Sequence, residues 1–334
     1  MSAAIDITLA NRRKPWEVAS WSEGQKRTSD TFATSSEMLQ AAGLAGWDVR
    51  LQPTYVRGPL GRWQETGTYA TVNKDGMVLG SGMSKRYRVL QSEEAFAFGD
   101  AIVDSGEAKW ERAGKVRGGE TVFGCMELQH LGVKVPGDDR GGDLQPYLLI
   151  VNSFGGWTPF CGIIAFIRPV CINTFQAAYG TKTPHRFAIK HTGTLDGKLQ
   201  MAREALGIAF QHAEEVKALT QQLMTTRLVD QQVQDIIDQV WPKAPGAKRT
   251  DPRSEIAVAV QQQYNASPTL DGIRGTGWGL MNAVTEYLDH VADYRPQGKD
   301  AGDPTKGLEL RGLNLMLDKA EKKKERVLQA LLAV

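Results

Sequence analysis

The sequence predicts an α+β fold: an antiparallel β-meander flanked by helices and followed by a helical C-terminal region. Short apolar segments separated by glycine-rich turns run through most of the first 190 residues, as in a meander. From Leu195 onward, apolar residues recur with the 3.6-residue period of a helix. The chain has 334 residues, 41% apolar and 23% charged, which is typical of a soluble globular protein with a substantial core.

The first third of the chain contains a tail, two helices and several strands. Residues 1–34 are polar and rich in Ser, Thr and charge, so we expect a flexible N-terminal tail. Residues 35–44 open with a serine and an early glutamate and favour a short helix. Residues 47–89 alternate like strands around a turn at "NKDG". Residues 92–106 form an amphipathic helix, with Ser92 as the N-cap and a glycine at its end.

The centre of the chain continues the meander. Strand-like segments occupy residues 109–116, 121–131, 147–154 and 160–172, with turns at "RGG" and "GGWTP". A short helix at 174–179, capped by Asn173 or Thr174, and an extended segment at 186–192 follow. Residues 35–194 are therefore predicted to be one α+β core.

Residues 195–334 are predicted to be helical. Apolar stripes with helical spacing lie in residues 199–216 and 229–240, and helical segments return at 277–294 and at the C-terminus. A Pro-, Gly- and Lys/Arg-rich stretch near residues 242–254 reads as a linker between these helices.

Charge and cysteine content restrict the setting. The net charge is only +2, so affinity for nucleic acid would need local clustering of basic residues. The N-terminus has no apolar segment of a secretory signal, and no apolar run reaches the length of a membrane span. Three cysteines without CxxC spacing fit a reducing compartment. We expect a cytoplasmic protein without membrane association.

No residue pattern identifies a catalytic or metal site. Cys171 could be a nucleophile with His185 or His191 as base, but its apolar neighbours favour a packing role. The two histidines are six residues apart, which does not let them share a metal, and "GTLDGK" is one residue too short for a phosphate loop. The sequence predicts no metal, no cofactor and no nucleotide hydrolysis.

One segment lacks acidic residues entirely. Residues 144–195 contain no Asp or Glu in 52 positions but carry several basic residues, and the preceding hairpin adds more. Basic residues interleaved with aromatic ones suit a groove that follows phosphates while bases stack on rings. The predicted DNA-binding residues are Trp110, Arg112, Lys115, Arg117, Trp157, Arg168, Arg186 and Lys190.

Three motifs carry a resemblance to a known family. "RPVCINTFQAA", "HRFAIKHT" and "GTGWGLMNAVTEYLDH" together resemble the phage/plasmid-like protein family of unknown function, from about Tyr87 onward. Members of that family commonly have Ser-His-Asp-Gly after the central strand, where this chain has Phe154 and Gly155 in place of His and Asp. The resemblance implies a setting on mobile bacterial DNA, and the departure argues against an enzyme.

A second, looser resemblance concerns the order of elements. A helix, a β-meander and a following helix, with basic residues along a hairpin, are similar to the core of ring-forming phage single-strand annealing proteins of the Red-beta, RecT and Erf types. This resemblance implies single-stranded DNA as partner, a homo-oligomeric ring or filament, and contact with a host replication or recombination protein.

The resulting hypothesis is a phage, prophage or plasmid recombination protein that binds and anneals single-stranded DNA. On this hypothesis Arg168 and Pro169 end a strand, Arg168 contacts phosphate and Cys171 packs in the core. Two alternatives stay open: an enzyme of unknown class that uses Cys171 or His191, and a non-catalytic phage interaction protein.

Overall fold

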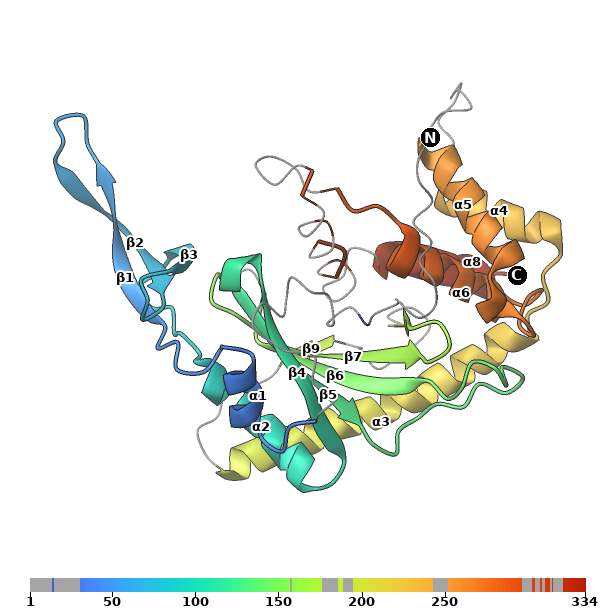
Figure 1. Cartoon of the computed structure of the whole chain (residues 1–334), viewed down its shortest axis with the longest axis horizontal. Helices are drawn as coiled ribbons and strands as arrows, with labels where there is room; N and C mark the ends of the chain where they lie inside the picture. The colour runs from blue at the N-terminus through green and yellow to red at the C-terminus, as the bar shows by residue number, and fades with distance from the viewer. Residues whose placement is uncertain are drawn as a thin grey trace.

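Two antiparallel sheets and a set of helices form the fold, which confirms the predicted α+β class. The computed structural model describes Lys14 and residues 31–156, 158–175, 186–188, 195–242, 252–295, 302–303, 307, 310–312, 314 and 321–334. The smaller sheet has the order β1-β2-β3, and the larger has the order β4-β5-β6-β7-β8, with β9 also paired to β7. Figure 1 shows the smaller sheet projecting to one side of the larger one.

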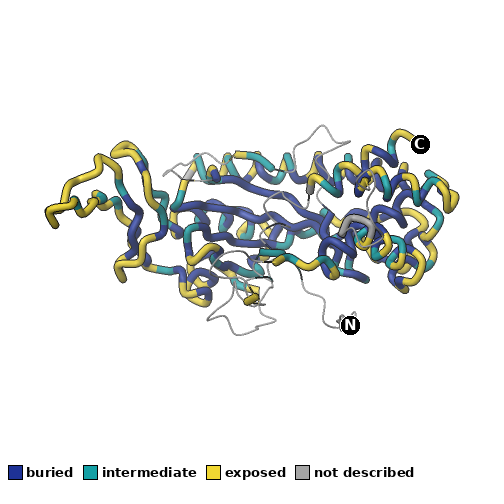
Figure 2. Tube along the Cα trace, turned by 90° about the horizontal axis from the view of Figure 1, so that it is seen from above, coloured by how far each residue is buried: buried dark blue, intermediate teal, exposed yellow. Residues whose placement is uncertain are grey.

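The smaller sheet, here called the arm, comprises β1 (Arg50–Arg57), β2 (Trp63–Val72) and β3 (Val78–Met83). Most of its residues are exposed, in contrast to the buried strands of the larger sheet (Figure 2). The predicted turn at "NKDG" joins β2 to β3. The Asn73 side chain accepts hydrogen bonds there from the backbone N–H groups of Asp75 and Met77, and Gly76 has a positive φ of 80°.

The larger sheet is the predicted meander. It contains β4 (Ala108–Val116), β5 (Thr121–Leu128), β6 (Gln145–Ser153), β7 (Cys161–Arg168), β8 (Asn173–Phe175) and β9 (Arg186–Ala188). Every residue of β7 and nearly every residue of β6 is buried, so both faces of these strands are covered. This explains why their sequences are continuous apolar runs rather than alternating ones.

Helices cover one face of the larger sheet. α1 (Ser35–Ala41), α2 (Ser92–Asp104) and the long α3 (Leu195–Thr225) contribute to the hydrophobic cluster on that face, and α3 runs along the length of the sheet (Figure 1). α2 confirms the predicted helix, although its N-cap is Gln91 rather than Ser92. Gly99 of α2 lies so close to the sheet that a Cβ atom there would come within 2.4 Å of the Trp110 ring.

The remaining helices gather at the end of the sheet opposite the arm (Figure 1). They are α4 (Asp230–Val240), α5 (Pro252–Ala266), α6 (Gly277–Glu286), which continues into a π-helical turn over Tyr287–Val291, and α8 (Glu321–Leu332). Their apolar faces belong to the same hydrophobic cluster as α1, α2 and one face of the sheet. The predicted helical C-terminal region is thus confirmed, and it shares one core with the meander.

Two local predictions need correction or fall outside the structure. Asn173 and Thr174 do not cap a helix, because residues 173–175 form β8 and pair with the end of β7. The rest of the helix predicted at 174–179 lies outside the described residues, as do the greater part of the linker near 242–254 and most of the tail. Of the extended segment predicted at 186–192, the described residues 186–188 form β9.

Candidate nucleic-acid interface on the arm and the cleft at its base

Arg168, the first-choice phosphate contact from the sequence, is buried in an internal ion pair. Its guanidinium donates to both carboxylate oxygens of Asp138 at 2.7 Å, and a third hydrogen bond reaches the backbone oxygen of Thr269 at 3.0 Å. Both charged side chains are 1% exposed. The Asp138 carboxylate also accepts a hydrogen bond from Trp278 Nε1 at 2.9 Å. With its donors committed to these partners, Arg168 does not contact phosphate, and that prediction is wrong.

A tight turn follows Arg168, where the sequence predicted the end of a strand. β7 ends at Arg168, whose backbone oxygen accepts hydrogen bonds from the N–H groups of Cys171 and Ile172. Ile172 has a φ of 57°, a left-handed conformation that is unfavourable for a β-branched residue. Cys171 is fully buried, and its burial raises the pKa of the thiol to about 11, with the opposing charge of Arg168 too weak to reverse this. A thiol that is protonated at neutral pH and out of reach of solvent does not suit a nucleophile.

Other motif residues join β8 to the C-terminal helices. The Thr174 N–H donates to the Asp289 carboxylate at 2.7 Å, and Lys324 forms a buried ion pair with Asp289 at 2.8 Å. Burial raises the pKa of Asp289, and Lys324 partly offsets this. The Asn173 side chain donates to the backbone oxygen of Asn282 at 3.2 Å. The described residues of the first and third motifs therefore form internal contacts between sheet and helices.

Trp110 is also an internal residue. It is 0% exposed, its Nε1 donates to Asp100 at 2.8 Å, and its ring packs edge-on against Phe96. A buried ring cannot stack with a base, so the prediction for Trp110 is wrong. Basic neighbours in the sequence do not show whether a tryptophan is buried or exposed, so the pattern around Trp110 could not exclude a buried ring.

The other predicted residues are scattered. Lys115 is half-buried, with its ammonium 5.6 Å from the Trp47 ring, and Arg117 is exposed and pairs with Glu120 at 3.8 Å. Arg112 is half-buried on β4. Arg186 is half-buried on β9 and donates to the Thr158 hydroxyl. The other two predicted DNA contacts, Trp157 and Lys190, lie outside the described part of the chain. His191, a candidate catalytic residue of the enzyme alternative, also lies outside it.

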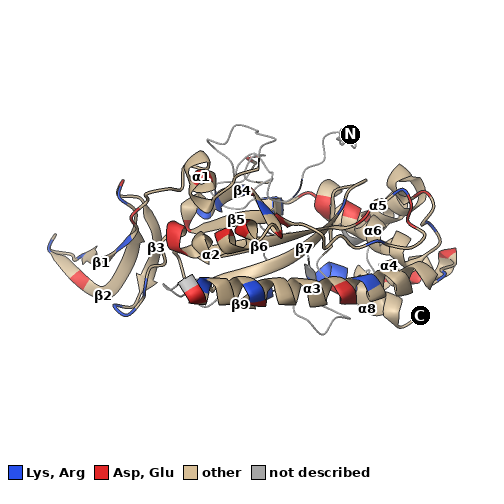
Figure 3. Ribbon diagram, turned by 90° about the horizontal axis from the view of Figure 1, so that it is seen from below, with Lys and Arg blue, Asp and Glu red and all other residues tan. Residues whose placement is uncertain are grey.

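The arm and the segment after it carry a concentration of positive charge that the sequence interpretation missed. Residues 50–88 contain seven Lys and Arg but only two Asp and Glu, an excess of +5 in a chain whose net charge is +2. Blue segments of the ribbon in Figure 3 mark Lys and Arg on the arm and at its base. Six of the seven are exposed and form no ion pair with another described residue: Arg57, Arg62, Lys74, Lys85, Arg86 and Arg88.

Exposed aromatic rings accompany these charges. Trp63 is 67% exposed and Tyr55 is 53% exposed. Arg57 is the direct cross-strand partner of Trp63, and Tyr55 lies two residues before Arg57 on the same strand. Residues in direct register, and residues two apart on a strand, share a face of the sheet. Tyr55, Arg57 and Trp63 therefore lie on one face of the β1–β2 hairpin, with the Trp63 ring directly across from the cation and the Tyr55 ring two residues along its strand.

The arm is attached to the larger sheet at the end of β6. Thr71 donates to the backbone oxygen of Phe154 at 2.9 Å, and Tyr87 donates to that of Ser153 at 2.9 Å. Gly80 approaches the turn after β6 so closely that a Cβ atom would lie 2.6 Å from the Gly155 Cα. These contacts fix where the arm leaves the core.

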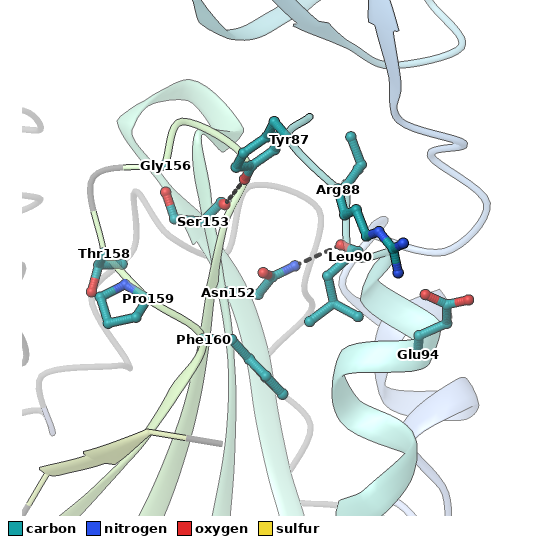
Figure 4. A pocket seen from close by; sticks show the side chains of 11 residues that line it. Tyr87, Arg88, Leu90, Glu94, Asn152, Ser153, Gly156, Thr158, Pro159 and Phe160 are labelled. Carbon is teal, nitrogen blue, oxygen red and sulfur yellow. Dashed lines mark hydrogen bonds between the residues drawn. The ribbon is translucent and has the colours of Figure 1, made fainter. Parts of the chain in front are cut away.

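A cleft of about 670 Å³ opens beside this attachment (Figure 4). Its walls come from the segment between β3 and α2, the start of α2, the end of β6 and the turn before β7. The lining residues include Tyr87, Arg88, Leu90, Asn152, Thr158 and Phe160. Because Arg186 donates to Thr158, it is the one described member of the sequence-predicted set with a hydrogen bond to a residue of this cleft.

The two residues that depart from the family pattern lie next to the cleft. Phe154 is 1% exposed and packs against Trp47. A Cβ atom at Gly155 would lie 2.0 Å from a carboxylate oxygen of Glu120, so the Glu120 side chain occupies the space that a larger residue at 155 would need. Neither position offers a polar side chain for chemistry in this chain.

Two other kinds of site are not found among the described residues. None of the described helices combines the length and the apolar character that a membrane crossing requires. Among the same residues, no group of three or more His, Cys, Asp and Glu side chains could hold a metal ion.

Comparison with known proteins gives a family but no activity. The sequence profile described as "Domain of unknown function (DUF932)" matches residues 79–306, more than half of the chain. The match begins within β3 and includes the segment before α2, the larger sheet and α6. No curated protein and no solved structure matches the chain.

Proposed function

Because the chain belongs to the DUF932 family, whose description names no activity, we propose its function from the arm and the cleft: it binds single-stranded DNA and promotes annealing without nucleotide hydrolysis. The observation that carries this proposal is the excess of +5 charges in residues 50–88, together with exposed Trp63 and Tyr55 beside Arg57. Cations that follow phosphates and rings that stack on bases are what sequence-tolerant single-strand binding needs.

The order of elements supports the same proposal. A helix, an antiparallel meander and a long helix that packs on the sheet follow one another in the chain. This is the order of elements in the resemblance to single-strand annealing proteins, and it is a likeness of fold pattern; the basic arm before the helix is an additional feature of this chain. We place the activity in the bacterial cytoplasm, on phage or plasmid DNA.

The arm also suits self-association. β1 and β3 are the edge strands of a three-stranded sheet, and strand edges pair readily with another chain. Exposed apolar side chains lie on the same sheet, namely Val56 and Val78 on its strands and Leu60 at the hairpin turn. We propose a homo-oligomer in which arms contact neighbouring copies, with a host replication or recombination protein as a further partner.

The first experiment measures binding of single- and double-stranded oligonucleotides by fluorescence anisotropy over a range of salt concentrations. We expect preferential single-strand binding with a log–log salt slope of about −0.7 for each phosphate neutralised. Changing Arg57, Arg62, Lys85 and Arg86 together to serine should weaken binding and reduce that slope by about 3, if each contacts one phosphate.

A matched control carries the same change in charge on other surfaces. Lys134, Arg203, Lys322 and Arg326 are exposed and lie outside the arm. Changing these four to serine should leave the affinity and the salt slope close to those of the parent. Equal losses in the two quadruple variants would show nonspecific attraction, and a parent that shows no salt-sensitive DNA binding would disprove the proposal.

A further inference from the structure

A largely buried asparagine presents a hydrogen-bond acceptor to the cleft at the base of the arm. Asn152, near the end of β6, is 4% exposed. Its Nδ2 donates to the backbone oxygen of Leu90 at 2.8 Å, which fixes the orientation of the carboxamide. The amide oxygen accepts no hydrogen bond from the described residues and points away from Leu90 toward the cleft (Figure 4).

This acceptor indicates a ligand that brings a donor. The bond to Leu90 holds the carboxamide in one orientation, and no described residue donates to its oxygen, so a donor on a ligand can take the place of water there. A carboxamide oxygen accepts and never donates, so it favours an N–H or O–H group and disfavours an anion. The deep part of the cleft therefore suits the neutral, donor-bearing part of a ligand.

The walls define the rest of the ligand. Phe160, Pro159, Val89 and Leu90 provide apolar surface. Phe160 is half-buried and is held by an edge-on contact with Phe98. Arg88 is an exposed cation among the lining residues. Glu94 also lines the cleft, on the side of Arg88 (Figure 4). A flat ring with N–H groups would rest on the apolar wall, and an attached anionic group would approach Arg88 rather than Glu94.

We propose that the cleft takes one unstacked nucleotide of the bound strand, with its base against Phe160, an N–H of the base donating to Asn152 Oδ1, and its phosphate near Arg88. Every nucleobase carries at least one such N–H, so the site fits a binder without strong sequence preference. The cleft volume of about 670 Å³ is within the range of small-molecule sites and accommodates a nucleotide. This inference rests on the proposed function for the source of the nucleotide, because a free nucleotide has the same chemistry.

The test compares two oligonucleotides of equal charge, one with bases and one in which every residue is abasic. Phe160→Leu keeps the wall apolar but removes the ring, and Asn152→Leu removes the acceptor. Phe210→Leu is the matched control, because Phe210 is 56% exposed on α3 and is not part of the cleft. We expect Phe160→Leu to weaken binding of the normal strand about five-fold or more. Binding of the abasic strand and the salt slope should stay unchanged, and Phe210→Leu should bind both strands like the parent.

The outcomes separate this inference from the proposed function. If the parent binds DNA with salt sensitivity and Phe160→Leu binds the normal strand equally well, the inference is wrong and the proposed function stands. If the parent binds no DNA, titration with dAMP and dCMP follows, observed through the Asn152 side-chain amide signals by NMR. A saturable shift, absent with ribose 5-phosphate, would keep the nucleotide site and reject strand binding; no shift would reject both. Because Asn152→Leu also loses the bond to Leu90, the decision rests on Phe160→Leu if Asn152→Leu does not fold.

Discussion

Replacing Arg168 by methionine should destabilise the fold strongly without removing a DNA contact. Among the described residues, the change leaves the buried Asp138 carboxylate with two hydrogen-bond donors, Trp278 Nε1 at 2.9 Å and the Gly141 N–H at 3.0 Å. Removing one partner of a buried ion pair typically costs about 3–5 kcal/mol, because the remaining charge is uncompensated. We expect a loss of this size in the free energy of unfolding.

The measurement is urea-induced unfolding followed by tryptophan fluorescence, with DNA binding measured on the folded protein. Arg186→Met is the matched control, since Arg186 is half-buried and binds a neutral hydroxyl. That control should lose about 1 kcal/mol or less. The double variant Arg168→Met with Asp138→Leu should recover part of the stability, because no buried charge then remains.

Two results would refute this reasoning. If the free energy of unfolding of Arg168→Met is within about 1 kcal/mol of that of the parent, Arg168 and Asp138 do not form a buried ion pair. A stable Arg168→Met protein with a reduced salt slope for DNA binding would return Arg168 to the role of a phosphate contact.

Two further predictions test packing and thiol chemistry. Gly99→Ala should lower the free energy of unfolding in urea by about 1–3 kcal/mol, because its Cβ would lie 2.4 Å from the Trp110 ring. The control Gly207→Ala on α3, which has open space around it, should raise the free energy of unfolding by about 0.5–1 kcal/mol. Equal effects of the two changes would contradict the close α2–sheet contact. The three cysteines are all buried, so the native protein should react with a thiol reagent such as Ellman's reagent at pH 8 only as fast as it unfolds, while the denatured protein reacts at three sites. Burial raises the pKa of Cys171 to about 11, so its thiolate should appear only near that pH while the fold persists, and rapid native labelling at Cys171 would revive the nucleophile hypothesis.

The sequence predicted the elements well because their signals are local. The helix at 92–104, the meander and the C-terminal helices each carry their own period and turn residues. The partners of Arg168 could not be predicted this way, because Asp138 is 30 residues away and Thr269 is 101 residues away along the chain. The prediction that Trp110 is exposed failed for a related reason. Strand β4 is covered by α1 and α2, and the sequence of a strand does not show which helices will cover it.

The arm was within reach of sequence reasoning, but only in part. Seven basic and two acidic residues between positions 50 and 88 could have been counted directly. The exposure of Trp63 could not, because tryptophan is usually at least partly buried and nothing local marks this one as open to solvent. The position of Asn152 beside Leu90 depends on how α2 meets β6, which is also a tertiary contact.

The absence of acidic residues from positions 144–195 has a different meaning in the folded protein. About a third of that span is β6 and β7, whose residues are almost all buried. A carboxylate there would need a buried partner to offset its desolvation, so burial alone excludes acidic residues from these strands. The one described arginine that is buried in the span, Arg168, is compensated by Asp138 from outside it.

The charge on the arm calls for another explanation. Most positions between 50 and 88 are exposed, and an exposed carboxylate costs almost nothing in stability. Folding therefore does not account for seven basic and only two acidic residues there. A bias that the fold does not require is better explained by a partner, and a strand of phosphates is the partner that such a bias with neighbouring aromatic rings would bind. For this reason the quadruple variant of the arm, rather than any change in the acid-free span, is the decisive test of the proposed function.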